Sequence, residues 1–277
     1  MKLLDTFAGI GGFSYAAEKL VGGFETTQFI EINPYCQKIL NKHWSHVPIH
    51  DDITTFTAKP GEFDIITGGF PCQDISNAGL QKGITKETRS GLFYELMRVI
   101  RMVRPKYVVL ENVAAILNRG LDIVLRELSE AGYNAEWSVI SASSVGACHQ
   151  RSRWWLVAYP DSKRLQRRLL QFNKELQETG HIRQKDTLSS PNTDSTRTQS
   201  DRTRQDKPVW SNAFFNSKER RTIKRDWTRY VSEPCLCRGD DGLRGRMDRL
   251  KALGNAVVPQ VAAIPLQRVK DLYATAS

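Results

Sequence analysis

The sequence has 277 residues, of which 40% are hydrophobic and 25% charged, and its formal net charge is +10. No apolar run approaches the roughly 18 residues that cross a bilayer, and Asp5 would interrupt the apolar core of a signal peptide. Five scattered cysteines exclude a disulfide framework, and Cys235 and Cys237 lack the matching pair of a zinc site. We expect a cytoplasmic monomer without a metal.

The positive charge is concentrated in one segment of the chain. Residues 161–249 hold 21 Lys and Arg against 13 Asp and Glu, which accounts for +8 of the total of +10. Basic side chains that neutralise phosphates gain free energy from counterion release, so this segment favours a polyanionic partner. A merely solvated basic surface is the alternative.

Short apolar runs alternate with amphipathic stretches from residue 2 to about residue 159, which is typical of a doubly wound parallel sheet. After residue 161 the alternation stops, and the polar residues 188–207 predict loop or disorder. We expect a terminal helix at 257–273, which Pro259 and Pro265 should limit or kink. The other expected strands are 2–7, 26–30, 63–67, 107–110, 136–141 and 154–159, and the other expected helices are 13–20, 34–43, 92–103 and 121–131.

The first expected strand leads into a glycine-rich turn, residues 8–12 (AGIGG), directly before the first helix. Glycines there let the backbone approach a nucleotide-like ligand, and Glu31, at the end of the second strand, suits ribose hydroxyls. Ser14 stands where a dinucleotide fingerprint needs its third glycine. The turn therefore leaves both S-adenosylmethionine binding and a purely structural role open.

A thiol and a carboxyl group follow two of the main strands. Cys72 comes after strand 63–67 and before a polar, glycine-bearing loop at 73–91, where a nucleophile can meet substrate under a mobile lid. Glu111 ends the strand that begins at residue 107. An acid beside a thiol suits addition to an electron-poor ring, whereas an inert cysteine and a buried ion pair are the alternatives.

Five segments resemble, in the same order, the motifs of DNA cytosine-5 methyltransferases. The resemblance covers about residues 1–159 and 249–273 and implies an α/β, Rossmann-like, doubly wound S-adenosylmethionine-dependent methyltransferase sheet. It implies a catalytic and cofactor-binding domain at 1–159, a smaller, irregular target-recognition domain at 160–246, and a C-terminal helix at 247–277 that returns to the catalytic domain. The segments are 5–13 (DTFAGIGGF), 69–76 (GFPCQDIS), 111–113 (ENV), 150–153 (QRSR) and 254–260 (GNAVVPQ).

The resemblance also implies a covalent mechanism on cytosine. Cys72 would add to carbon 6 so that carbon 5 can attack the methyl group of S-adenosylmethionine. Glu111 would bind the base at N3 and the amino group, which favours a raised carboxyl pKa. Arg151 and Arg153 would hold the base, and Asn112 would order the turn rather than touch substrate.

For the cofactor, the resemblance assigns the glycine turn to the pocket wall, two acids to the ribose and the adenine, and two residues near the C-terminus to its closure. Ile32 is a departure, because some members have an aromatic residue there that stacks on adenine. The expected cofactor residues are Phe7, Ala8, Gly9, Gly11, Gly12, Glu31, Ile32, Asp52, Ile53, Pro71, Leu92, Asn255 and Val257.

The implied partner is double-stranded DNA, from which the target base must be flipped because it cannot react inside the stack. Ser76 and Gln81 are candidates to fill or flank the vacated space. Arg220, Arg221 and Arg225 are candidates to contact DNA from the basic segment.

Several alternatives stay open. A branch of the same family methylates transfer RNA with the same residues, although Pro71-Cys72-Gln73 favours DNA. A catalytically silent nucleic-acid-binding protein conflicts with the intact Cys72, Glu111, Arg151 and Arg153, and a nicotinamide dehydrogenase conflicts with the missing third glycine. A restriction-modification role in a bacterium and an anti-restriction role in a phage-infected cell both fit.

Overall fold

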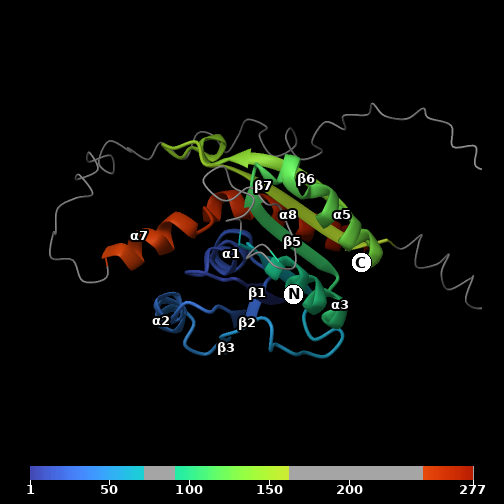
Figure 1. Cartoon of the computed structure of the whole chain (residues 1–277), viewed down its shortest axis with the longest axis horizontal. Coiled ribbons are helices and arrows are strands. Elements are labelled where there is room, and N and C mark those ends of the chain that lie inside the picture. Colours follow the sequence, from blue (N-terminus) through green and yellow to red (C-terminus); the bar gives the residue numbers. More distant parts are fainter. Residues whose placement is uncertain (72–90, 162–245, 277) are drawn as a thin grey trace, which may run out of the picture.

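The structure is a computed structural model that describes residues 1–71, 91–161 and 246–276 (Figure 1). Within these residues seven strands form one sheet in the order β3-β2-β1-β4-β5-β7-β6. The expected α/β, doubly wound arrangement is therefore confirmed, and β3 is a strand that the sequence analysis missed. The strands are β1 (Lys2–Thr6), β2 (Glu25–Ile30), β3 (Ile49–His50), β4 (Ile65–Gly68), β5 (Tyr107–Val113), β6 (Tyr133–Ser141) and β7 (Ser152–Pro160).

The sheet is mixed rather than wholly parallel, which corrects one expectation. The pairs from β3 to β5 are parallel, whereas β7 runs antiparallel to both β5 and β6. The reason is the short connection at 142–151 between β6 and β7. A crossover back to a parallel strand needs a dozen or more residues, so the chain returns as a hairpin instead.

Helices cover both faces of the sheet (Figure 1). The one-turn α1 (Gly12–Tyr15), the π-helix η1 (Ala16–Val21), α2 (Pro34–His43) and α8 (Pro259–Ala276) lie on one face, and α3 (Leu92–Val103) and α5 (Leu121–Glu130) lie on the other. Leu3 and Leu4 show why the strands read as continuous apolar runs: both are fully buried, but in clusters on opposite faces. The short elements are α4 (Ile116–Arg119), the 3-10 helix η3 (Ala142–Val145) and α7 (Arg246–Asn255).

The helix bounds agree with the sequence at α2 and α3 and differ at both ends of the chain. The expected helix at 13–20 is an α-helical turn followed by a π-helix. The expected terminal helix begins at Pro259, because a proline suits the first turn, and continues past Pro265 to Ala276. Among the described residues, no helix is both long and apolar enough to span a membrane.

A partly buried ion pair fixes α8 to the β6–β7 hairpin. The Arg268 guanidinium donates from Nε to Glu136 Oε2 (3.0 Å) and from Nη2 to Glu136 Oε1 (2.9 Å). Tyr159 Oη donates to the same Glu136 Oε1 at 3.0 Å. The C-terminal helix is thus attached to the distal strands of the sheet.

Arg268→Ala should lower the free energy of unfolding by about 1 to 2 kcal/mol, because it removes a two-pronged, partly desolvated contact. Urea denaturation followed by circular dichroism measures the change. Arg126→Ala is the matched control, since Arg126 lies 4.0 Å from Glu130 in an exposed pair, and should cost less than about 0.5 kcal/mol. Equal losses in the two variants would contradict the assignment.

Candidate functional site

Strand register brings three expected site residues and one glycine of the 69–76 motif into one row. Thr6 pairs with Ile30 on β2 and with Gly68 on β4, and Gly68 pairs with Leu110 on β5. The residues that follow these partners along the parallel strands therefore stand side by side at the carboxyl edge of the sheet. They are Phe7, Glu31, Gly69 and Glu111. This edge is where an open α/β sheet binds its ligands.

The glycine turn is held by Glu31. Gly9 N–H donates to Glu31 Oε2 at 2.7 Å, and Asn33 N–H donates to Oε1 at 2.8 Å. Phe7 has a φ of 52°, a left-handed conformation that is unfavourable for a bulky residue. Such strain persists only where the surroundings enforce it, and it marks the first residue of the turn as a functional candidate.

The glycines of the turn have different physical roles. A Cβ on Gly9 would meet nothing within 4 Å, so Gly9 borders open space. A Cβ on Gly11 would lie 2.6 Å from the Trp44 ring, and one on Gly12 would lie 2.5 Å from Val257 Cγ2. Gly9 thus leaves room for a ligand, whereas Gly11 and Gly12 allow close packing of α2 and of the C-terminal segment.

A buried carboxyl group lies beneath the turn. Asp5 is fully buried and accepts hydrogen bonds from Ser14 Oγ (2.7 Å) and Thr67 Oγ1 (2.8 Å). Burial raises the pKa of Asp5 to about 7, and the hydrogen bonds from Ser14 and Thr67 oppose this only in part. The network joins β1, α1 and β4, which carry the two glycine motifs. The sequence analysis noted Asp5 and Ser14 but did not connect them.

Glu111 is the buried acid of the site. Its Oε1 lies 3.1 Å from Arg153 Nε, and its Oε2 lies 3.1 Å from where a Cβ on Gly69 would stand. Burial raises the pKa of Glu111 to about 7, although Arg153 and Arg151 both lower it. The expected raised pKa is confirmed in direction, and Gly69 is identified as the residue that makes room for this carboxyl group.

The two arginines of the 150–153 motif point to different partners. Arg153 pairs with Glu111. Arg151 instead donates from Nη1 to Gly254 O (2.9 Å) and from Nη2 to Ala256 O (2.6 Å), so its guanidinium contacts the C-terminal segment. The structure brings Glu111 and Arg153 together, and contact of either arginine with the base stays a prediction.

Asn112 orders the chain beside the site, as expected. Its side-chain Nδ2 donates to the carbonyl of Phe70 at 3.1 Å, and its Oδ1 accepts from the backbone N–H of Val113 at 2.8 Å. Phe70 and Pro71 are the residues that lead to Cys72 in the sequence. The amide therefore fixes the backbone at the end of β4 relative to the end of β5.

The remaining expected cofactor residues divide into an apolar group and a polar rim. Phe7, Ile53 and Leu92 pack in or against the same apolar cluster, together with Phe70. Ile32 is 73% exposed beside Glu31, so its side chain is free to cover a ligand. Of the other expected cofactor residues, Ala8 is buried and Asn255 is exposed. Asp52, Pro71 and Val257 are half-buried.

Other expected residues lie outside the part of the chain that the structure describes. They include the proposed nucleophile and the expected DNA contacts. They are Cys72, Ser76, Gln81, Arg220, Arg221 and Arg225, together with the expected loops at 73–90 and 188–207.

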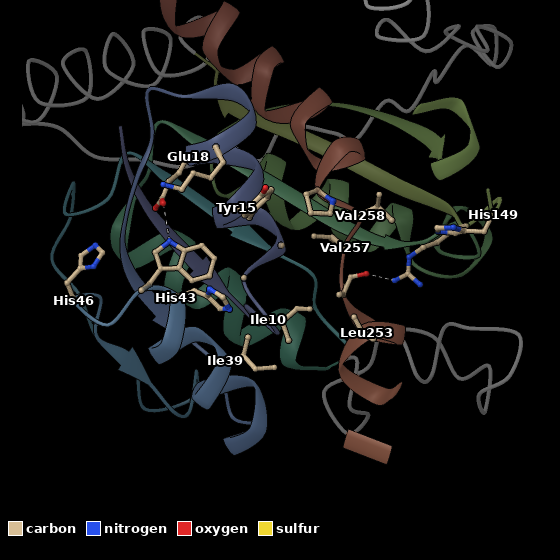
Figure 2. Close-up of a pocket in the computed structure, with 17 residues that line it drawn as sticks. Ile10, Tyr15, Glu18, Ile39, His43, His46, His149, Leu253, Val257 and Val258 are labelled. Atoms are coloured by element: carbon tan, nitrogen blue, oxygen red, sulfur yellow. Dashed lines mark hydrogen bonds between the residues drawn. The ribbon is translucent and has the colours of Figure 1, made fainter. Parts of the chain in front are cut away.

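Figure 2 shows a pocket of about 770 Å³ beside the glycine turn. Its lining includes Ile10, Tyr15 and Trp44 from the N-terminal part of the chain and Leu253 and Val257 from the C-terminal part. Of the expected site residues, Gly11, Gly12, Val257 and Arg151 border it. The sequence analysis did not single out Ile10, Tyr15 or Leu253, because their only signal was apolar character near a motif.

No three His, Cys, Asp or Glu side chains gather as metal ligands in the described ranges.

The fold and the site define an α/β protein with its motif residues at the carboxyl edge of the sheet and a partly buried glutamate–arginine pair. The family model described as C-5 cytosine-specific DNA methylase matches residues 1–241. The chain belongs to this family.

Curated relatives share the matched region. The type II methyltransferase M.CviJI of Paramecium bursaria Chlorella virus IL3A is 38% identical over 160 residues, which cover 57% of this chain and 42% of the relative. M.NlaX of Neisseria lactamica is 33% identical over 163 residues, or 57% of this chain and 52% of the relative. The match thus spans about half the length of these relatives. The solved Dnmt2 methyltransferase of S. pombe is 25% identical with a TM-score of 0.49, over 58% of this chain and 51% of that one.

Stability should depend on pH through the two buried carboxyl groups. Because folding raises the pKa of Asp5 from 3.8 to about 7 and that of Glu111 from 4.5 to about 7, the folded state holds protons that the unfolded state releases. Their contribution to stability is therefore present below about pH 4 and is lost as the pH rises to about 7. Asp5→Asn should gain stability relative to the wild type over that rise, as measured by urea denaturation at several pH values.

Asp52→Asn is the control with the opposite sign, because the hydrogen bond from Thr54 N–H lowers the pKa of Asp52. It should show no relative gain as the pH rises. If the Asp5→Asn difference does not change between pH 4 and pH 7, the buried network is assigned wrongly.

Gly12→Ala should destabilise the protein by about 1 to 3 kcal/mol, because the new methyl group would overlap Val257 Cγ2. Adding Val257→Ala should recover part of that loss, although Val257→Ala alone removes packing. A double-mutant cycle of thermal or urea unfolding measures the coupling. Additive losses in the free energy of unfolding would show that the Gly12→Ala methyl group does not clash with Val257.

Proposed function

We propose that this chain transfers a methyl group from S-adenosylmethionine to carbon 5 of cytosine in double-stranded DNA, with Cys72 as covalent nucleophile. The observation that carries the proposal is the Glu111–Arg153 pair at the carboxyl edge of the sheet, with Glu111 Oε2 against Gly69. Gly69 stands three residues before Cys72 in a motif shared with the family. Family membership supports the reaction class, and the residues of this edge support the assignment of roles.

Glu111 is suited to exchange a proton with the base. Burial raises its pKa to about 7, so near neutral pH it can be protonated or ionised at little cost. Arg153 engages Oε1, which leaves Oε2 on the Gly69 side for N3 and the amino group of cytosine. A carboxyl group with this pKa can donate to N3 as the adduct forms and take the proton back afterwards.

The covalent cycle balances with these residues. The Cys72 thiolate forms a bond to carbon 6 while N3 takes a proton from Glu111, which leaves carbon 5 as the nucleophilic carbon of an enamine. S-adenosylmethionine, when bound, would supply the electrophilic methyl group: carbon 5 takes up the methyl as the sulfonium–methyl bond breaks, its electron pair stays on sulfur, and S-adenosylhomocysteine is the leaving group. Carbon 5 then loses its proton to a solvent base, the sulfur–carbon 6 bond breaks, and its electron pair returns to sulfur. N3 returns its proton to Glu111.

The residues present fit the cofactor. Gly9 borders open space, Glu31 is fixed at the neighbouring strand end by two backbone N–H groups, and Phe7, Ile53 and Leu92 supply an apolar surface. A carboxylate suits ribose hydroxyls and an apolar surface suits adenine. The departure at Ile32 replaces an aromatic stacking partner with an exposed aliphatic side chain.

DNA is the proposed partner, and the basic residues 160–246 are proposed as the target-recognition domain between the catalytic domain at 1–159 and the C-terminal segment at 247–277. Their charge favours phosphate contact. The target base must leave the stack to reach the site, which costs a few kcal/mol. The curated relatives are named type II methyltransferases of bacteria and of a virus, which supports a cytoplasmic restriction-modification or viral role.

Wild-type protein incubated with S-adenosylmethionine and DNA that contains 5-fluorocytosine should form an adduct that survives denaturation. Elimination requires a base to remove a proton from carbon 5, and it stalls because fluorine occupies that position. Cys72→Ala should form none. A gel shift under denaturing conditions detects the adduct, and Cys36→Ala, which changes a buried cysteine, controls for loss of a thiol.

Transfer RNA and unmodified DNA serve as parallel substrates with labelled cofactor. Methylation of RNA but not of DNA would overturn the assignment to DNA. Normal methylation by Cys72→Ala would overturn the covalent mechanism. Glu111→Gln should lower kcat by about 10² to 10⁴, as expected for loss of a proton donor.

A further inference from the structure

Arg151 makes an unusual long-range connection. Its guanidinium donates two hydrogen bonds to the carbonyls of Gly254 (2.9 Å) and Ala256 (2.6 Å), which are more than 100 residues further along the chain. Its backbone has a φ of 34°, which L-residues rarely adopt. Backbone strain of this kind persists only when other contacts hold it. The side chain is therefore fixed where it is.

Gly254 lies in the last turn of α7, and Ala256 lies in the connection between α7 and α8, here called the α7–α8 turn. Helix α7 ends at Asn255, and α8 begins at Pro259. The last carbonyls of a helix have no partner within the helix, and a cation there also interacts favourably with the helix dipole. Arg151 thus acts as a cap from another part of the chain, and it determines where the α7–α8 turn lies.

The α7–α8 turn in turn touches the glycine motif. Val257 approaches Gly12 so closely that a Cβ on Gly12 would lie 2.5 Å from Val257 Cγ2. In Figure 2, Val257 and Leu253 face Ile10 across the pocket, and His149 lies on the same side as the turn. A displaced turn would therefore open the wall that stands against the glycine motif.

We infer that Arg151 is a positioning residue for the cofactor: by holding the α7–α8 turn against Gly12, it sets the affinity of the DNA-free protein for S-adenosylmethionine. This inference rests on the proposed function. It differs from the base-holding role implied by the family resemblance, because a side chain that only touches cytosine has no influence before DNA binds. Arg153, two residues further on, has the Glu111 contact and serves the base instead.

The test is equilibrium binding of S-adenosylmethionine in the absence of DNA, by isothermal titration calorimetry. Arg151→Ala should raise the Kd at least about tenfold, which corresponds to the loss of one to two charge-assisted hydrogen bonds. Arg151→Lys keeps the positive charge but loses the paired Nη1 and Nη2 donors, so its Kd should lie between those of Arg151→Ala and the wild type. Arg153→Ala should stay within about threefold of the wild type.

Arg268→Ala controls for general loosening, because Arg268 also ties the C-terminal segment to the β6–β7 hairpin, through Glu136. It should lower Tm and leave the Kd within about threefold of the wild type. Hydrogen exchange should show faster exchange at residues 252–258 in Arg151→Ala than in Arg268→Ala. If Arg151→Ala does not fold, the comparison of Arg151→Lys with Arg268→Ala decides.

The outcomes separate this inference from the proposed function. A wild-type protein that binds the cofactor, with Arg151→Ala and Arg151→Lys binding equally well, overturns the positioning role alone. An equal loss in Arg268→Ala overturns it too, because the effect is then general. A wild-type protein that binds no S-adenosylmethionine overturns the proposed function as well.

Discussion

The register of β1 against β2 and β4, and of β4 against β5, places the residues of the candidate site in one row. Because Thr6 lies opposite both Ile30 and Gly68, and Gly68 lies opposite Leu110, the next residue of each strand falls in one row. A slip of one residue would turn Glu111 to the opposite face of the sheet and away from Arg153. Fully buried side chains on both faces, such as Leu3 and Leu4, make such a slip costly.

Two carboxyl groups are buried near this row, and the protein treats them differently. Asp5 is surrounded by hydroxyl donors and joins β1, α1 and β4, whereas Glu111 faces the site with one oxygen engaged by Arg153. Desolvation outweighs the hydrogen bonds and the arginines, so the pKa is raised to about 7 in both cases. Only Glu111 stands where a proton can be passed to a ligand. Under the proposed function, the same physical effect would serve rigidity at Asp5 and proton transfer at Glu111.

The C-terminal segment returns to the first domain through contacts with the β6–β7 hairpin. Arg268 reaches Glu136 on β6, and Arg151, just before β7, reaches the α7–α8 turn. The antiparallel hairpin that broke the expected parallel pattern is what supplies both attachment points. Val257 then meets Gly12, so that a motif near residue 255 and one near residue 10 form a single wall. The distal strands therefore also anchor the C-terminal segment that packs against the glycine turn.

The sequence by itself determined the α/β class, the bounds of α2 and α3, and the motif residues, because apolar periodicity and glycine placement are local properties. The family resemblance led us to expect the raised pKa of Glu111, since a carboxyl group that gives a proton to the base must hold that proton near neutral pH. Only the tertiary structure decided the antiparallel β7, the partners of Arg151 and the distinct roles of Gly9, Gly11 and Gly12. Those depend on which side chains meet across more than 100 residues of chain, as Arg151 meets Gly254, and no local pattern records such distances.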